Sequence, residues 1–132
     1  MSRPNNQEWR HGDPDHFTGE SWIGSLSESG DEGGVRVLAV QFNPGARTNW
    51  HSHSEGQVLH ILAGNGIVVN EAGDHVDLTP GDTTTTPAGE LHWHGAMPAT
   101  PMLQMSITTG GGAIWTDRVV TDEEYREATN RT

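Results

Sequence analysis

The sequence contains no cysteine, and its seven basic residues are all arginine. Disulfides and thiolate chemistry are therefore excluded, and any metal ion must be held by nitrogen and oxygen ligands. The arginines are dispersed and are outnumbered by 18 Asp and Glu, for a formal net charge of −11 at pH 7. Because clustered cations recognise phosphate backbones and anionic membrane surfaces, we expect neither a nucleic-acid nor a membrane partner.

Long hydrophobic runs are also missing. No apolar stretch approaches the roughly 18 residues that span a bilayer, and the polar residues 1–15 lack the apolar core of a signal peptide. We therefore expect a cytoplasmic protein. A chain of 132 residues fits one domain, because roughly 100 to 200 residues is the usual domain size.

Hydrophobic residues make up only 32% of the chain, but 17 glycines and many threonines indicate short strands joined by tight turns. From Phe17 onward, apolar runs alternate with turn signals at the spacing of about 8 to 12 residues that is typical of a sandwich or barrel. We predict a single all-β domain over residues 17–132, after a flexible N-terminal arm over residues 1–16, which is polar and shows no periodicity. The expected strands are 18–26, 35–42, 48–53, 57–63, 67–70, 75–78, 83–86, 91–95 and 102–109.

The tail over residues 121–128 is predicted to form a short helix with a structural role. Thr121 can cap it, and Glu124, three residues later, can complete a capping box.

Two histidine pairs carry the candidate chemistry. His51 and His53 are two residues apart, as are His92 and His94, so each pair projects from one face of its strand. Gln57 begins the next strand after a tight turn, and if it faces inward, then His60 faces outward. We assign His51, His53, Gln57 and His92 as ligands of a metal ion and His94 as a base beside it, because imidazole suits divalent transition metals. The alternative, that these are ordinary surface or core histidines, fits one pair better than two.

The segment 45–96 resembles the paired motifs of the cupin superfamily, G-x5-H-x-H-x3-E-x6-G and G-x5-P-x-G-x2-H-x3-N. Every fixed glycine, histidine and proline is present, while Gln57 replaces the usual Glu and Ala96 the usual Asn. The resemblance implies a double-stranded β-helix, or jelly-roll, barrel.

More narrowly, the stretches 44–48, 87–96 and 120–125 resemble small single-domain cupins that include the manganese-dependent hydroxynitrile lyases. In those enzymes three histidines and one glutamine bind the metal, which implies the same four ligands here, with His94 as the additional pocket histidine. Two pocket residues of that subgroup, a histidine and a glutamine, are Gln104 and Thr108 in this sequence.

Four neutral ligands leave the full charge of a divalent ion uncompensated, which favours polarisation of a carbonyl or hydroxyl over oxidation of the metal. We therefore predict Lewis-acid and general-base chemistry on a small carbonyl or hydroxy compound, including carbon–carbon bond cleavage of the hydroxynitrile lyase kind. The expected metal is Mn(II), with Fe(II), Ni(II) and Zn(II) as alternatives. An Fe(II)-dependent dioxygenase and a non-catalytic ligand-binding cupin remain competing functions.

The walls of the substrate pocket are predicted from strand alternation. The residues expected to line it are Leu38, Val40, Leu59, Gln104 and Thr108. Val58, Leu62 and Trp93 should face outward on the strands, and such an apolar outer face suggests a homodimer that covers it.

Overall fold

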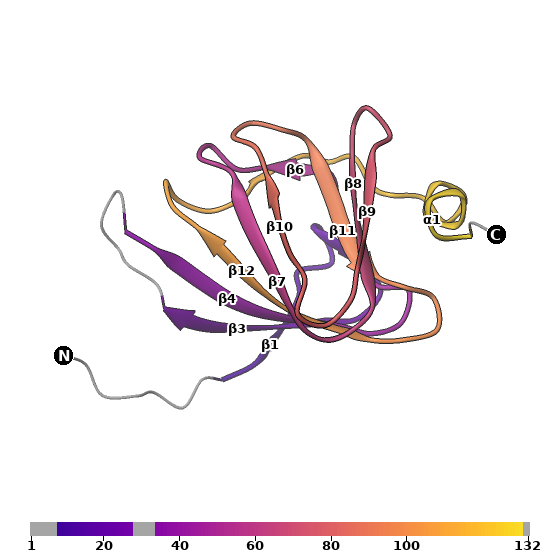
Figure 1. Ribbon diagram of the computed structural model, residues 1–132, viewed down its shortest axis with the longest axis horizontal. Coiled ribbons are helices and arrows are strands. Elements are labelled where there is room, and N and C mark those ends of the chain that lie inside the picture. Colours follow the sequence, from indigo (N-terminus) through magenta and orange to yellow (C-terminus); the bar gives the residue numbers. More distant parts are fainter. Residues whose placement is uncertain (1–7, 28–33, 131–132) are drawn as a thin grey trace.

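The computed structural model describes residues 8–27 and 34–130. Two antiparallel sheets face each other and curl into a jelly-roll-like barrel (Figure 1), which confirms the predicted all-β fold. One sheet contains, in spatial order, β1 (Arg10–His11), β3 (Ser21–Ser27), β4 (Arg36–Phe42), β12 (Met102–Thr108), β7 (Gln57–Gly64) and β10 (Thr83–Thr86). The other contains β13 (Ile114–Trp115), β6 (His51–Ser52), β11 (His92–Ala96), β5 (Arg47–Thr48) and β2 (Phe17–Thr18), and β8 (Gly66–Asn70) pairs with both β11 and β9 (His75–Leu78).

A hydrophobic core lies between the sheets. Buried and less buried residues alternate along β12 and along the first half of β7, as a strand with one face toward a core requires. Gln57, Leu59 and Ile61 are therefore buried, whereas the half-buried His60 turns away and lies beside Thr83. The core residues are Phe17, Val40, Phe42, Ala46, Ile61, Val68, Leu78, Ala96 and Met102.

The strand expected over residues 48–53 is interrupted. Its ends form β5 and β6, while the backbone N–H of Asn49 donates to His16 O and that of Trp50 donates to Arg118 O. These bonds lead to loops from distant parts of the sequence, which strand periodicity does not reveal. The unpredicted strands β1 and β13 have two residues each, too few to show an alternating pattern.

Residues 1–7 of the expected flexible arm lie outside the described residues. From Arg10 onward, however, the arm contacts the barrel: β1 pairs with β3, and the His11 ring lies 3.6 Å, centroid to centroid, from the ring of Trp22. Residues 13–16 then form a turn that leads into β2. The contacts of this segment are made with residues distant in sequence, so its polar composition gave no sign of them.

The helix α1 (Asp122–Thr129) covers the outer face of the second sheet (Figure 1). Trp93 faces outward from the barrel as expected, but it is fully buried against Val120 and Tyr125. The expectation that a second subunit covers Trp93 is therefore wrong, because a helix of the same chain does so. Leu62, on the other sheet, is exposed. No helix in the described ranges is long and apolar enough to cross a membrane.

Polar contacts fix the helix in place. Thr121 Oγ1 accepts the backbone N–H of Glu124, which confirms the predicted cap, while the Glu124 carboxylate lies 3.6 Å from the guanidinium of Arg118. The buried Arg47 donates to Val120 O, pairs with the Asp122 carboxylate at 2.8 Å and stacks over the Tyr125 ring. Arg47 thus connects β5 to the start of the helix.

The Tyr125 hydroxyl donates a 2.6 Å hydrogen bond to the buried carbonyl of Ala96. Tyr125→Phe leaves that carbonyl without this donor, so we expect the free energy of unfolding to fall by about 1–2 kcal/mol. Urea denaturation measures the change, and Glu127→Gln, on an exposed part of the same helix, is the control that should leave stability unaltered. Equal stability of Tyr125→Phe and the unsubstituted protein would contradict this account of the helix contact.

Candidate metal centre

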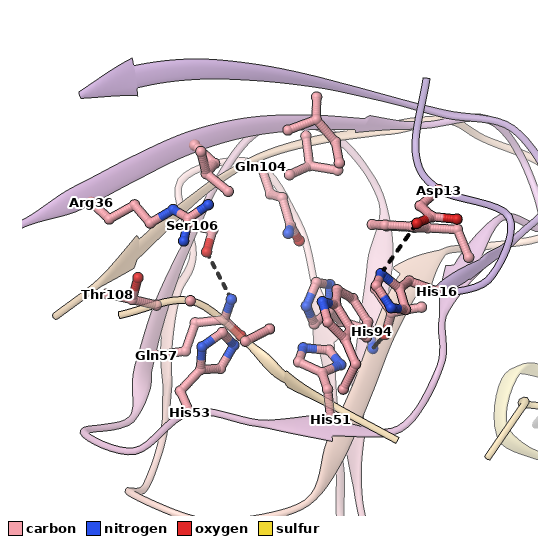
Figure 2. A pocket seen from close by; sticks show the side chains of 18 of the residues that line it. Asp13, His16, Arg36, His51, His53, Gln57, His94, Gln104, Ser106 and Thr108 are labelled. Carbon is pink, nitrogen blue, oxygen red and sulfur yellow. Dashed lines mark hydrogen bonds and ion pairs between the residues drawn. The ribbon is translucent and has the colours of Figure 1, made fainter. Parts of the chain in front are cut away.

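Four side chains from three segments point toward one place inside the barrel. His51 lies on β6, His53 follows that strand, Gln57 begins β7 and His92 begins β11. One ring nitrogen from each of the three histidines lies within 4.8 Å of the other two. Figure 2 shows His51, His53 and Gln57 at the floor of a cavity. Three buried imidazoles at this separation can hold one metal ion.

Local structure explains the convergence. His51 lies directly opposite His92 in the register of β6 and β11, and their ring centroids are 4.4 Å apart. Gly56 adopts a φ of +85°, and a Cβ at this position would lie 2.7 Å from the carbonyl oxygen of Thr86. Glycine is therefore required for the tight turn that brings Gln57 to the site.

Hydrogen bonds orient two of the rings. His51 Nδ1 lies 2.9 Å from Asn49 O, and His92 Nδ1 lies 3.0 Å from Glu90 O. A carbonyl oxygen only accepts, so each Nδ1 carries the proton, and each neutral ring has its lone pair on Nε2. Metal-binding histidines are commonly fixed by this kind of bond to a backbone carbonyl.

Burial keeps these rings neutral. It lowers the pKa of His51 well below its usual value, and it also lowers the pKa of His92. The pKa of His53 falls to about 4, chiefly through burial and then through the charges of His92 and Arg36. Neutral imidazole is the form that coordinates a metal.

Gln57 supplies the fourth potential ligand. Its Nε2 donates to Ser106 Oγ at 2.7 Å, which directs Oε1 toward His92 Nε2 at 3.0 Å. In this arrangement both facing atoms carry lone pairs, because the His92 proton is on Nδ1, and two acceptors do not hydrogen-bond to each other. A cation between them satisfies both, so the donor set fits a metal ion.

His94 lies beside this group. Its ring centroid is 5.1 Å from that of His51 and 5.8 Å from that of His92. The ring is buried, and neither of its nitrogens has a hydrogen-bond partner among residues 8–27 and 34–130. Burial lowers the pKa of His94 well below its usual value. His94 is thus a neutral imidazole with an available lone pair. It lies next to the ligand cluster, which consists of His51, His53, Gln57 and His92.

A cavity of about 370 Å³ adjoins the cluster. Leu38, Val40, Gln104 and Thr108 line it, at the positions that strand alternation indicated. Leu59, which was also expected to line it, is fully buried and is not among the residues of the cavity wall.

Sequence reasoning missed several wall residues, among them His16, Trp115 and Arg36. The ring of His16 stacks parallel to that of Trp115 at 4.3 Å, and Trp115 lies 4.6 Å from the ring of His51. Arg36, at the start of β4, also lines the cavity. His16 belongs to the expected arm and Trp115 to a two-residue strand, so neither showed a local signal of its place.

Comparison with known proteins identifies the family of this chain. The cupin domain model matches residues 38–108. An (R)-mandelonitrile lyase of Granulicella tundricola is 40% identical over 129 residues, which cover 96% of this chain and 98% of that protein. A cupin-like protein of Thermotoga maritima is 34% identical with a TM-score of 0.85, over 100% of this chain and 98% of the other. The polyketide cyclase RemF of Streptomyces resistomycificus, 17% identical with a TM-score of 0.70 over 96% and 92% of the two chains, is alike in fold. The resemblance inferred from the sequence motifs is confirmed.

Removal of a ligand should abolish metal binding. We expect protein stripped with a chelator to melt roughly 5 to 15 °C higher when Mn(II) is added at about a hundred times its dissociation constant. His51→Ala should lose this shift, because it removes one of the converging nitrogens. His60→Ala is the matched control, since His60 faces away from the site. A full shift in His51→Ala, measured by calorimetry, would place the ion elsewhere.

Proposed function

The chain belongs to the cupin family, and from this premise we propose that it is a metal-dependent lyase acting on a small carbonyl or hydroxy compound. The observation that carries the proposal is the pairing of four neutral ligand groups with a neutral, buried His94 next to them. The 40% identity of this chain to an enzyme named (R)-mandelonitrile lyase supports cleavage of a carbon–carbon bond in a hydroxynitrile. Mn(II) is the proposed metal, and the protein is proposed to work in the cytoplasm as a homodimer.

The ligand residues would be His51, His53, Gln57 and His92. A divalent ion held by them, with no anionic ligand to offset its charge, would polarise a carbonyl or hydroxyl oxygen and would lower the pKa of the hydroxyl. The same lack of anionic ligands disfavours a higher oxidation state, which favours a lyase over an oxygen-dependent reaction.

His94 moves the proton in this scheme. Its free ring nitrogen accepts the hydroxyl proton of a hydroxynitrile as the carbonyl forms and the carbon–carbon bond breaks. The electron pair of that bond leaves with cyanide, and the imidazolium returns the proton to it. Burial favours the neutral ring before and after each cycle.

The cavity wall orients the substrate and limits the access of water. Leu38 and Val40 contribute apolar surface on β4, while Trp115 and His16 form an aromatic wall next to His51. These groups limit access of water and orient the substrate toward His94.

Substitution of His94 tests the proposal. We expect His94→Ala, and His94→Gln, which fills more of the space, to retain metal while kcat for cleavage of mandelonitrile falls about 10²- to 10⁴-fold, the usual contribution of a general base. Elemental analysis measures the metal content, and an assay of benzaldehyde formation measures the rate of cleavage. Loss of the metal in both variants would make His94 a ligand and contradict its assigned role.

An assay without oxygen separates the competing reactions. A lyase keeps its full rate under nitrogen, whereas a dioxygenase stops. Tight binding of carbonyl compounds with no turnover under either condition would show that the protein is a binding cupin.

A further inference from the structure

Two rows of side chains line the cavity on neighbouring strands. On the inner face of β12 lie Gln104, Ser106 and Thr108, which are all polar and buried. On the inner face of β4, directly opposite them in register, lie Val40, Leu38 and Arg36 respectively. A ligand along these strands therefore meets an apolar row on one side, a polar row on the other, and a cation at one end.

The Arg36 guanidinium lies at the cavity itself. Figure 2 shows it reaching into the cavity on the side of Ser106 and Thr108. A Cβ at Gly112, another lining residue, would lie 2.6 Å from Arg36 Nη1, which places the charged end of the side chain against the Gly112 backbone.

The cavity wall carries further charged side chains. Arg10 lines the cavity as well, and the carboxylate among the lining residues, Asp13, lies 3.9 Å from His16. Among the described residues that line the cavity, two arginines thus accompany one carboxylate, whereas the whole chain has a net charge of −11. A guanidinium at the wall of a cavity attracts an anionic ligand.

Gln104 provides an independent indication of a ligand. Its side chain is fully buried, and Figure 2 shows it directed into the cavity between Arg36 and His94. Neither Oε1 nor Nε2 has a hydrogen-bond partner in the described part of the chain. A buried amide that lacks partners costs free energy, which a ligand oxygen at this position would recover.

We propose that the natural substrate is a hydroxy or oxo carboxylic acid whose carboxylate binds at Arg36 and Thr108, with an oxygen atom at Gln104. The inference rests on the proposed function, because the hydroxyl or carbonyl is directed to the ligand cluster. It differs from a cyanohydrin such as mandelonitrile, which is uncharged. A guanidinium binds a carboxylate through two parallel hydrogen bonds, and Thr108, directly across from Arg36, offers a hydroxyl to the same group.

Calorimetric titration of the manganese-loaded protein tests the inference without requiring turnover. The probes are 2-, 3- and 4-hydroxybutanoate, each compared with its uncharged carboxamide. We expect at least one acid to bind about tenfold or more tighter than its amide, as a charge-assisted hydrogen bond provides. Equal binding of acid and amide throughout the series would overturn the inference.

Substitutions of Arg36 and Gln104 test which residues bind the ligand. Arg36→Gln should reduce the acid-to-amide ratio of affinities to about twofold or less. Arg36→Lys should give an intermediate ratio, because the paired donors of the guanidinium are lost. Arg126→Gln, on α1, is the control that should leave the ratio intact. An unchanged ratio in both Arg36 variants would contradict the assignment. Gln104→Leu should weaken acid and amide by a similar factor, and undiminished binding of both would remove Gln104 from the site.

Protein stripped of metal separates this inference from the proposed function. If the carboxylate binds at Arg36, the ratio survives chelation. A ratio that disappears on chelation and persists in Arg36→Gln would place the carboxylate at the metal, which refutes the inference and leaves the lyase proposal standing. If the acid-to-amide ratio is preserved but the protein cleaves no substrate, the inference stands and the lyase proposal is refuted.

Discussion

Two imidazole rings held in one tautomer are the constraint on which the site depends. His51 and His92 each direct Nδ1–H to a carbonyl two residues earlier in the chain, so that both lone pairs face the same buried point. Burial keeps the rings neutral, and Gln57 adds an amide oxygen at 3.0 Å from His92. Acceptors gathered in this way are unfavourable without a cation. The barrel thus concentrates ligand groups, and the register of β6 with β11 determines where they meet.

The contacts outside the barrel preserve that register. Arg47, on β5 beside β11, binds the carbonyl of Val120 and the carboxylate of Asp122, and Tyr125 bonds to Ala96 at the end of β11. The short helix therefore closes the outer face of the strand that carries His92 and His94. Stability of the helix contact and geometry of the site are linked through one strand.

The sequence predicted the site better than its surroundings. The spacing of His51 with His53 and of His92 with His94 indicated convergence because strand alternation is a local property, which holds for His92 and His94 on β11. It placed His53 near His51 even though the expected strand is interrupted at Asn49 and Trp50 and β6 ends before His53. The stacking of His16 on Trp115, and the burial of Trp93 by α1, depend on contacts between distant segments. No local pattern records such contacts, so the wall at His16 and the internal cover of Trp93 were missed.

The central claim is that three imidazoles and one amide bind a single ion. A crystal structure of the protein grown with Mn(II), with anomalous scattering used to locate the metal, tests it most directly. The account predicts one strong anomalous peak at about 2.0–2.4 Å from a nitrogen of His51, His53 and His92 and from Oε1 of Gln57, with His94 outside bonding distance. A peak bound by His94 in place of Gln57, or no peak among these residues, would contradict it.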